Sequence, residues 1–205
     1  MAQYVYYFGD GAADGAGNMK ETLGGKGAGL AEMVHLGVPV PPGFTISTDV
    51  CRHFMVHGAS ASPYPEGLDA LVGAALGRVE SSVGAGFGDE KNPLLLSVRS
   101  GARVSMPGMM DTVLNLGLND RTVAGLAART GDERFAWDSY RRFVQMYGDV
   151  VMNLKPESKE ERDPFELLLE AKKEARKVHL DTELSAADLK ELVAEFKAEI
   201  LRRSS

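Results

Sequence analysis

Residues 94–112 read LLLSVRSGARVSMPGMMDT, and this stretch decides the expected fold. The run from Leu94 to Val98 is short, continuous and apolar, which predicts a β-strand buried on both of its faces. Strands of that kind belong to sheets that helices cover, so the stretch favours an α/β architecture. The segment after Val98 is rich in small residues, which indicates that the chain leaves the strand through a loop.

Two arginines follow the predicted strand. Arg99 and Arg103 enter the loop at the carboxyl end of the strand, which is where open α/β sheets bind their ligands. A guanidinium group can hold phosphate through two hydrogen bonds, and a charge beside an apolar strand needs a partner. We therefore expect these arginines to bind a polyanion. The methionines of the loop can lie beside a nucleotide base or fill the core, and the core is the commoner place for them.

A second candidate site is the segment GGKGAGL at residues 24–30. Lys26 stands among glycines just before a predicted helix, where backbone N–H groups and an ammonium group can both reach a phosphate. The spacing matches neither common glycine-rich nucleotide motif, because no Ser or Thr follows Lys26 and Leu30 stands where one motif requires glycine. Taken alone, the segment fits a phosphate site and a glycine-rich turn with a solvated lysine equally well.

A third candidate is the pair Arg141 and Arg142 in an aromatic-rich segment. Arg142 is five residues from Trp137, so the two side chains leave the predicted helix on different faces. One arginine could face a phosphate while the other is exposed to solvent. A surface ion pair is the favoured role for at least one of them.

The remaining elements follow from local signals. Residues 4–8 predict a strand that ends at Gly9, and residues 44–46 predict another. We expect Thr48, Asp163 and Ser185 to cap helices. Apolar periodicity predicts helices over residues 27–36, 49–57, 66–83, 120–129, 133–147, 164–178 and 185–201.

The distribution of glycine divides the chain into two parts. All 23 glycines lie between Gly9 and Gly148, whereas the remainder of the chain is charged and helix-prone. We therefore expect a glycine-rich α/β subdomain over residues 1–118 and a mainly helical subdomain over residues 119–205. The tail from Asp149 onward either packs on the body with its charges solvated or contacts further domains, and packing through Leu167, Leu168, Leu189, Leu192 and Phe196 is favoured.

Composition excludes several classes of protein. The net charge of −6 argues against nonspecific nucleic-acid binding, and the single Cys51 excludes a disulfide framework. No apolar run reaches the length of about 20 residues that a membrane span needs, and the first residues do not resemble a targeting segment. We expect a cytoplasmic protein. His53 and His57 could face one metal ion, but no carboxylate motif accompanies them, so no metal site is predicted.

Four strings together resemble the first part of the pyruvate, phosphate dikinase family, in the same order along the chain. The longest of them is more specific for this family than for the related phosphoenolpyruvate synthases and glucan water dikinases, which share only its SVRS-like centre. The strings are LGGKGAGLAEM (23–33), VPVPPGFTIST (38–48), LLLSVRSGARVSMPGMMDTVLNLGLND (94–120) and RFAWDSYRRFVQMYGDVVM (134–152).

This resemblance implies the first portion of an ATP-grasp-like nucleotide-binding domain. Such an enzyme converts ATP, phosphate and pyruvate into AMP, diphosphate and phosphoenolpyruvate through a phosphohistidine domain and a pyruvate-binding domain. The resemblance assigns Lys26 and Arg99 to contacts with the nucleotide phosphates, and Arg103 and Arg142 to phosphate or diphosphate. It assigns to a loop over the nucleotide the residues Gly108, Met109, Met110, Asp111 and Thr112.

The length of the chain departs from the family. The magnesium ligands expected for MgATP would lie in a downstream part, as would the phosphohistidine and pyruvate-binding domains. The resemblance therefore predicts an N-terminal ATP-binding fragment that cannot complete the reaction alone. The alternative is a noncatalytic module that keeps the fold and binds a nucleotide or a partner chain.

Overall fold

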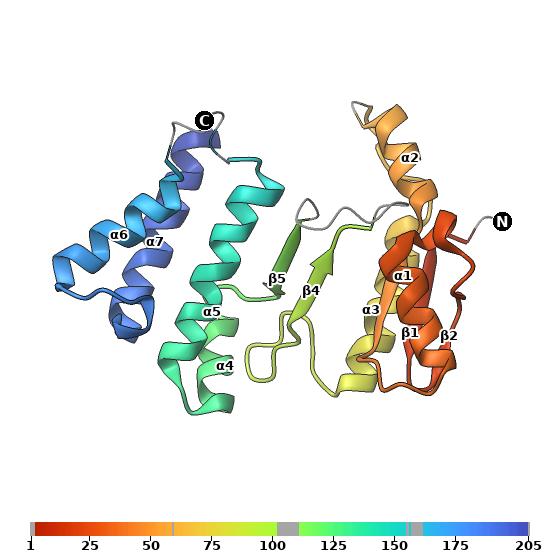
Figure 1. Ribbon diagram of the computed structural model, residues 1–205, viewed down its shortest axis with the longest axis horizontal. Helices are drawn as coiled ribbons and strands as arrows, with labels where there is room; N and C mark the ends of the chain where they lie inside the picture. The colour runs from red at the N-terminus through yellow and green to blue at the C-terminus, as the bar shows by residue number, and fades with distance from the viewer. Residues whose placement is uncertain (1–2, 59, 102–110, 155, 157–161, 205) are drawn as a thin grey trace. The chain divides into compact units, whose positions relative to one another are not determined.

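The computed structural model describes residues 3–58, 60–101, 111–154, 156 and 162–204 (Figure 1). These residues form two compact units. Unit 1 contains the described residues up to Ala85 together with Ser100 and Gly101. Unit 2 contains Gly86–Arg99 and the described residues from Asp111 onward. The expected boundary at residues 118 and 119 follows composition, and it stays a prediction about subdomain organisation.

Unit 1 combines a small antiparallel sheet with helices. Its strands have the order β2-β1-β3, and β1 pairs with β3 from Val5 opposite Ile46 to Phe8 opposite Gly43. The predicted strands and helices of this region are all present, and β2 is a strand that the sequence did not indicate. The elements are β1 (Val5–Gly9), β2 (Ala12–Ala13), α1 (Lys20–His35), β3 (Gly43–Ile46), α2 (Thr48–His57) and α3 (Leu68–Val83).

A polar cluster joins β1 to α3 in unit 1. The Tyr7 hydroxyl and the Ser82 hydroxyl donate hydrogen bonds of 2.7 and 2.5 Å to the Asp10 carboxylate. The Arg78 guanidinium lies 3.5 Å from the centre of the Tyr7 ring, within the range of a cation–π contact. The hydrogen bonds from Ser82 and Tyr7 lower the pKa of Asp10. The cluster thus keeps a charged carboxylate at the turn that follows β1.

Unit 2 is mainly helical. Its two strands pair antiparallel, with Arg99 opposite Thr112. A π-helix at Tyr147–Val151 extends α5, and a short 3-10 helix at Asp181–Glu183 precedes α7. The other elements are β4 (Leu96–Arg99), β5 (Thr112–Leu116), α4 (Thr122–Thr130), α5 (Glu133–Met146), α6 (Pro164–Arg176) and α7 (Ala186–Ser204).

The prediction that residues 94–98 form a strand buried on both faces is wrong. Leu94 is buried, but it precedes the strand, which begins at Leu96. Along β4 the burial falls steadily, and Val98 is 49% exposed. A continuous apolar run indicates that its side chains are buried. Here the leucines at the start of the run occupy the buried positions, and the strand that follows pairs with a single neighbour in a two-stranded sheet.

The core of unit 2 lies among its helices. α5 packs against α4 and α7, and α6 packs against α7. The side chains of Leu189, Leu192 and Phe196 are fully buried in this cluster, as the helical periodicity predicts. Leu167, which was expected to pack with them, is 41% exposed. With two small antiparallel sheets beside packed helices, the described residues have a mixed α+β fold.

Of the three helix caps predicted from the sequence, two are confirmed by the structure. Asp163 accepts hydrogen bonds from the N–H groups of Phe165 and Glu166 at 2.8 and 3.0 Å. Ser185 and Asp188 form the expected reciprocal capping pair at the start of α7. The prediction that Thr48 caps α2 is wrong, because its hydroxyl donates to the Glu21 carbonyl at 2.6 Å.

We expect Asp163→Ala to lower the free energy of unfolding of unit 2 by about 1 kcal/mol, because two N–H groups of α6 lose their acceptor. The fluorescence of Trp137, the single tryptophan of the chain, follows the urea unfolding of this unit. The control variant is Asp163→Asn, which keeps an oxygen acceptor and should stay close to the wild type. Equal stability of all three proteins would contradict the capping role.

Candidate functional site

The structure brings two of the predicted motifs together in unit 1. The Lys26 ammonium donates a hydrogen bond of 3.0 Å to the carbonyl oxygen of Ser100, 74 residues further along the chain. The backbone of Gly101 also passes close to α1, since a Cβ atom placed on Gly101 would lie 3.7 Å from the Leu23 carbonyl oxygen. The GGKG segment therefore lies beside Ser100 and Gly101.

The glycine-rich segment differs from its expected form. It was predicted to precede a helix, but it lies inside α1, where Gly24 interrupts the helical conformation with φ of 69°. Only glycine adopts this conformation without strain. The residues after Gly24 thus begin a new helical turn, and the N–H groups of a first turn lack partners within the helix. Lys26 stands in that turn.

Close packing holds this part of α1 in place. A Cβ atom on Gly27 would lie 2.8 Å from the Thr45 side chain of β3, which is too close for any side chain. The hydrogen bond from Thr48 to the Glu21 carbonyl fastens the first turn of α1 to α2. Lys26 therefore extends from a backbone that both the sheet and a neighbouring helix position. A positioned cation beside first-turn N–H groups is suited to bind an anion.

Unit 2 contains the other described candidates. Arg99 is the last residue of β4 and is exposed, and Thr112 lies opposite it as the first residue of β5. Among the described residues Arg99 has no ion pair. Asp111, which precedes β5, is also exposed. Arg99 is thus an exposed cation at the end of a largely exposed strand, and its role in binding a polyanion stays a prediction.

Arg142 occupies an ion pair on α5. Its guanidinium lies 3.0 Å from the Asp138 carboxylate, while Arg141 contacts the same carboxylate at 2.7 Å. Arg141 is buried, and Arg142 is exposed. Burial opposes ionisation of Asp138, but the hydrogen bond and charge of Arg141, aided by Arg142, keep the pKa of Asp138 below its usual value. A role of Arg142 in binding phosphate stays a prediction.

Several predicted residues lie outside the described part of the chain. They are Arg103, Gly108, Met109 and Met110. Lys26 belongs to unit 1, whereas Arg99, Asp111, Thr112 and Arg142 belong to unit 2. The sequence argument missed Ser100 as the partner of Lys26. No signal in the sequence could have revealed it, because the acceptor is a backbone carbonyl that any residue would offer.

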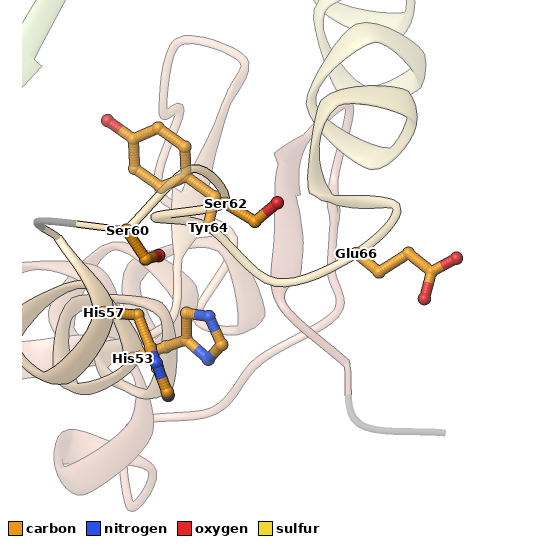
Figure 2. Close-up of a pocket in the computed structure, with 6 residues that line it drawn as sticks. All are labelled: His53, His57, Ser60, Ser62, Tyr64 and Glu66. Atoms are coloured by element: carbon orange, nitrogen blue, oxygen red, sulfur yellow. The ribbon is translucent and has the colours of Figure 1, made fainter.

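Two further features of the structure are a cavity in unit 1 and the length and apolar character of the helices. A cavity in unit 1 is lined by His53, His57, Ser60, Ser62, Tyr64 and Glu66, none of which is a predicted nucleotide contact (Figure 2). Within the described ranges, no helix combines the length and the apolar character that crossing a bilayer requires.

Comparisons with known proteins agree with the motifs. Residues 20–71 match the family model described as the AMP/ATP-binding domain of pyruvate phosphate dikinase. The chain is 57% identical over 96% of its length to pyruvate, phosphate dikinase 2 of Oryza sativa subsp. japonica, and covers 21% of that protein. It is 52% identical over 98% of its length to pyruvate, phosphate dikinase of Rhizobium meliloti, again covering 21%. For the enzyme of Clostridium symbiosum the identity is 50% over 97% of the chain, with 21% coverage.

These similarities confirm the resemblance seen in the sequence. The chain is similar over almost its whole length to pyruvate, phosphate dikinases, and residues 20–71 match the model of their AMP/ATP-binding domain. It spans about a fifth of the length of the curated relatives that it matches. The matched residues 20–71 include the glycine-rich segment with Lys26.

Proposed function

We propose that this chain supplies part of the ATP-binding site of a pyruvate, phosphate dikinase and that Lys26 binds a nucleotide phosphate. The hydrogen bond between Lys26 and Ser100 is the observation that carries the proposal. It joins the ammonium group of one motif to the backbone of a second motif that is distant in sequence, and it leaves two of the three ammonium donors for a ligand.

The chemistry of the segment supports this role. Phosphoryl transfer depends mainly on positioning and on neutralising charge, and a lysine at the first turn of a helix contributes to both. Arg99 is proposed as a further phosphate contact because it is exposed at a strand end and lacks an ion pair within the described ranges. For residues 108–112 the proposal rests on the resemblance, which assigns them to cover the nucleotide.

The proposal assigns no magnesium ligand to this chain. Among the residues that the structure describes, no group of three or more His, Cys, Asp or Glu side chains could surround a metal ion. Magnesium bound to a nucleotide is held mainly by the phosphates, by water and by one or two carboxylates, and no step is derived through it. An ATP-grasp architecture and a cytoplasmic location also stay predictions, and some relatives are named chloroplastic.

The full dikinase reaction is proposed to need residues in addition to these. The relatives are about five times longer, and none of the four histidines stands in a Thr-Ser-His segment like the one that carries the phosphoryl group in the family. We therefore propose that the chain binds ATP but forms no AMP from ATP, pyruvate and phosphate on its own. The noncatalytic module is the alternative, in which the nucleotide or a partner is bound without any part in phosphoryl transfer.

Calorimetric titration with ATP and Mg²⁺ tests the proposal. We expect Lys26→Ala and Arg99→Ala each to weaken ATP binding about tenfold, a change of about 1.4 kcal/mol, because each removes a charged phosphate contact. The controls are Lys20→Ala, an exposed lysine of the same helix α1, and Arg121→Ala, an exposed arginine of unit 2. Both controls should bind ATP as the wild type does.

Three results would oppose the proposal. Absence of ATP binding by the folded wild type would show that the chain is not a nucleotide-binding unit. Equal affinity of the wild type, Lys26→Ala and Arg99→Ala would show that the nucleotide binds elsewhere. Formation of AMP by the chain alone, with pyruvate and phosphate present, would show that it needs no further domain.

A further inference from the structure

Two histidines on α2 lie against each other at the edge of the cavity in unit 1. The ring centres of His53 and His57 are 4.4 Å apart, and the ring planes are tilted by 38°. The two residues are one helical turn apart, so both side chains leave the same face of α2. Figure 2 shows the two imidazoles beside each other, with Ser60, Ser62 and Tyr64 on the segment that follows the helix.

The surroundings leave both imidazoles available. His57 is exposed and His53 is half-buried. Neither takes part in an ion pair with a described residue, and the neighbouring Arg52 is paired with Asp49. The Phe54 ring, on another face of the helix, stacks on Tyr64 at 5.5 Å and ties the following segment to α2. The pair therefore lies on the half of α2 that contacts the segment after the helix through Phe54 and Tyr64.

We propose that His53 and His57 form a two-histidine binding site for a late first-row divalent metal ion, of which Cu²⁺ is the strongest binder. A metal ion bound at 2.0–2.1 Å by two imidazole nitrogens needs those nitrogens within about 4 Å of each other. The ring centres of His53 and His57 are 4.4 Å apart, and rotation of the two side chains about their χ angles would turn a nitrogen of each ring toward a common ion. Imidazole is a preferred ligand of Cu²⁺, Ni²⁺ and Zn²⁺, and Cu²⁺ forms the most stable complexes of the series.

The site uses two protein ligands, and water completes the coordination. Within the described part of the chain, no third His, Cys, Asp or Glu side chain joins the pair. Glu66 lines the same cavity, but Figure 2 shows its carboxylate directed away from the imidazoles. A site of this kind is open, so it binds metal more weakly than a closed four-ligand site but leaves coordination positions for an incoming ligand.

The site is separate from the proposed nucleotide contacts. None of the six residues that line the cavity is Lys26 or Ser100. Failure of the metal proposal would therefore not affect the ATP proposal. Failure of the ATP proposal would likewise not affect the metal proposal.

Nuclear magnetic resonance on the wild-type chain tests the site directly. In mildly alkaline buffer, which keeps imidazole neutral, substoichiometric Cu²⁺ should broaden the ring signals of His53 and His57 first, because a paramagnetic ion affects its own ligands most. The signals of two other exposed histidines, His35 at the end of α1 and His179 in the segment after α6, are the internal control. Equal broadening of all four histidines would overturn the proposal, since it would show unspecific binding to single imidazoles.

Variants provide the second measurement. We expect His53→Gln and His57→Gln each to weaken binding of Ni²⁺ in calorimetric titration by about tenfold or more, because the second imidazole binds as part of the same molecule at high effective concentration. His35→Gln and His179→Gln should leave the affinity unchanged. Circular dichroism confirms that each variant is folded. Equal Ni²⁺ affinity of the wild type and His57→Gln would overturn the proposal.

Discussion

Phe196→Ala is expected to lower the free energy of unfolding of unit 2 by about 3–5 kcal/mol. Phe196 is 0% exposed and lies on the face of α7 that packs on the other helices. Its ring meets the ring of Phe165 from α6 at a centroid distance of 5.1 Å and an angle of 63°. An edge-to-face aromatic pair of this geometry adds to the free energy of burial. Truncation loses both contributions and leaves a cavity that three helices surround.

The measurement is urea unfolding followed by the fluorescence of Trp137, which lies on α5 in the same unit. The matched control is Phe135→Ala, because Phe135 is also a helical phenylalanine of unit 2 but is 48% exposed. Its truncation should cost less than about 1 kcal/mol. If both variants lost the same stability, the core would not be centred on the contact between α6 and α7.

Gly125→Ala is expected to destabilise unit 2 by about 1–3 kcal/mol, although alanine is the better helix former. Gly125 is buried in α4, and a Cβ atom there would lie 2.0 Å from the Glu90 carbonyl oxygen and 2.8 Å from its carbonyl carbon. These are backbone atoms of the segment that precedes β4, so no side-chain rotation can relieve the overlap. Either the helix or that segment must move.

A glycine without such a neighbour should show the opposite sign. Gly73 lies inside α3, and no atom lies within 4 Å of its added Cβ. Gly73→Ala should therefore stabilise its helix by about 0.5–1 kcal/mol. Hydrogen exchange measured on peptides from α3 and α4 reports the two helices separately. Faster exchange of α4 in Gly125→Ala and slower exchange of α3 in Gly73→Ala are expected, and unchanged exchange of α4 would contradict the steric argument.

Helices with a clear cap were predictable almost to the residue. α6 begins at Pro164 after the Asp163 cap, and α7 follows the pair Ser185 and Asp188. Such signals succeed because donor and acceptor are two or three residues apart, so that the local sequence contains both partners. The prediction for Thr48 failed because its hydroxyl found an acceptor on α1 instead.

The sequence singled out candidate residues, whose role in binding stays a prediction, but it did not predict their geometry. The motif around Lys26 fits a phosphate site and a glycine-rich turn equally well when taken alone, and its likeness to the dikinases is confirmed. The interruption of α1 at Gly24 was not predicted, because a glycine permits a left-handed conformation without requiring it. Asn115, in β5, has φ of 60° and illustrates the same point for a residue other than glycine.

The sequence by itself determined the helical segments, two of the caps and the relationship to the pyruvate, phosphate dikinases, since each depends on neighbouring residues or on an ordered series of motifs. Only the tertiary structure decided that β4 is largely exposed, that Lys26 meets Ser100 and that Glu90 forbids a side chain at Gly125. These contacts join residues that are far apart along the chain. Their formation depends on the path of the whole backbone and on which of several apolar surfaces becomes buried. A local sequence pattern contains information on neither of these.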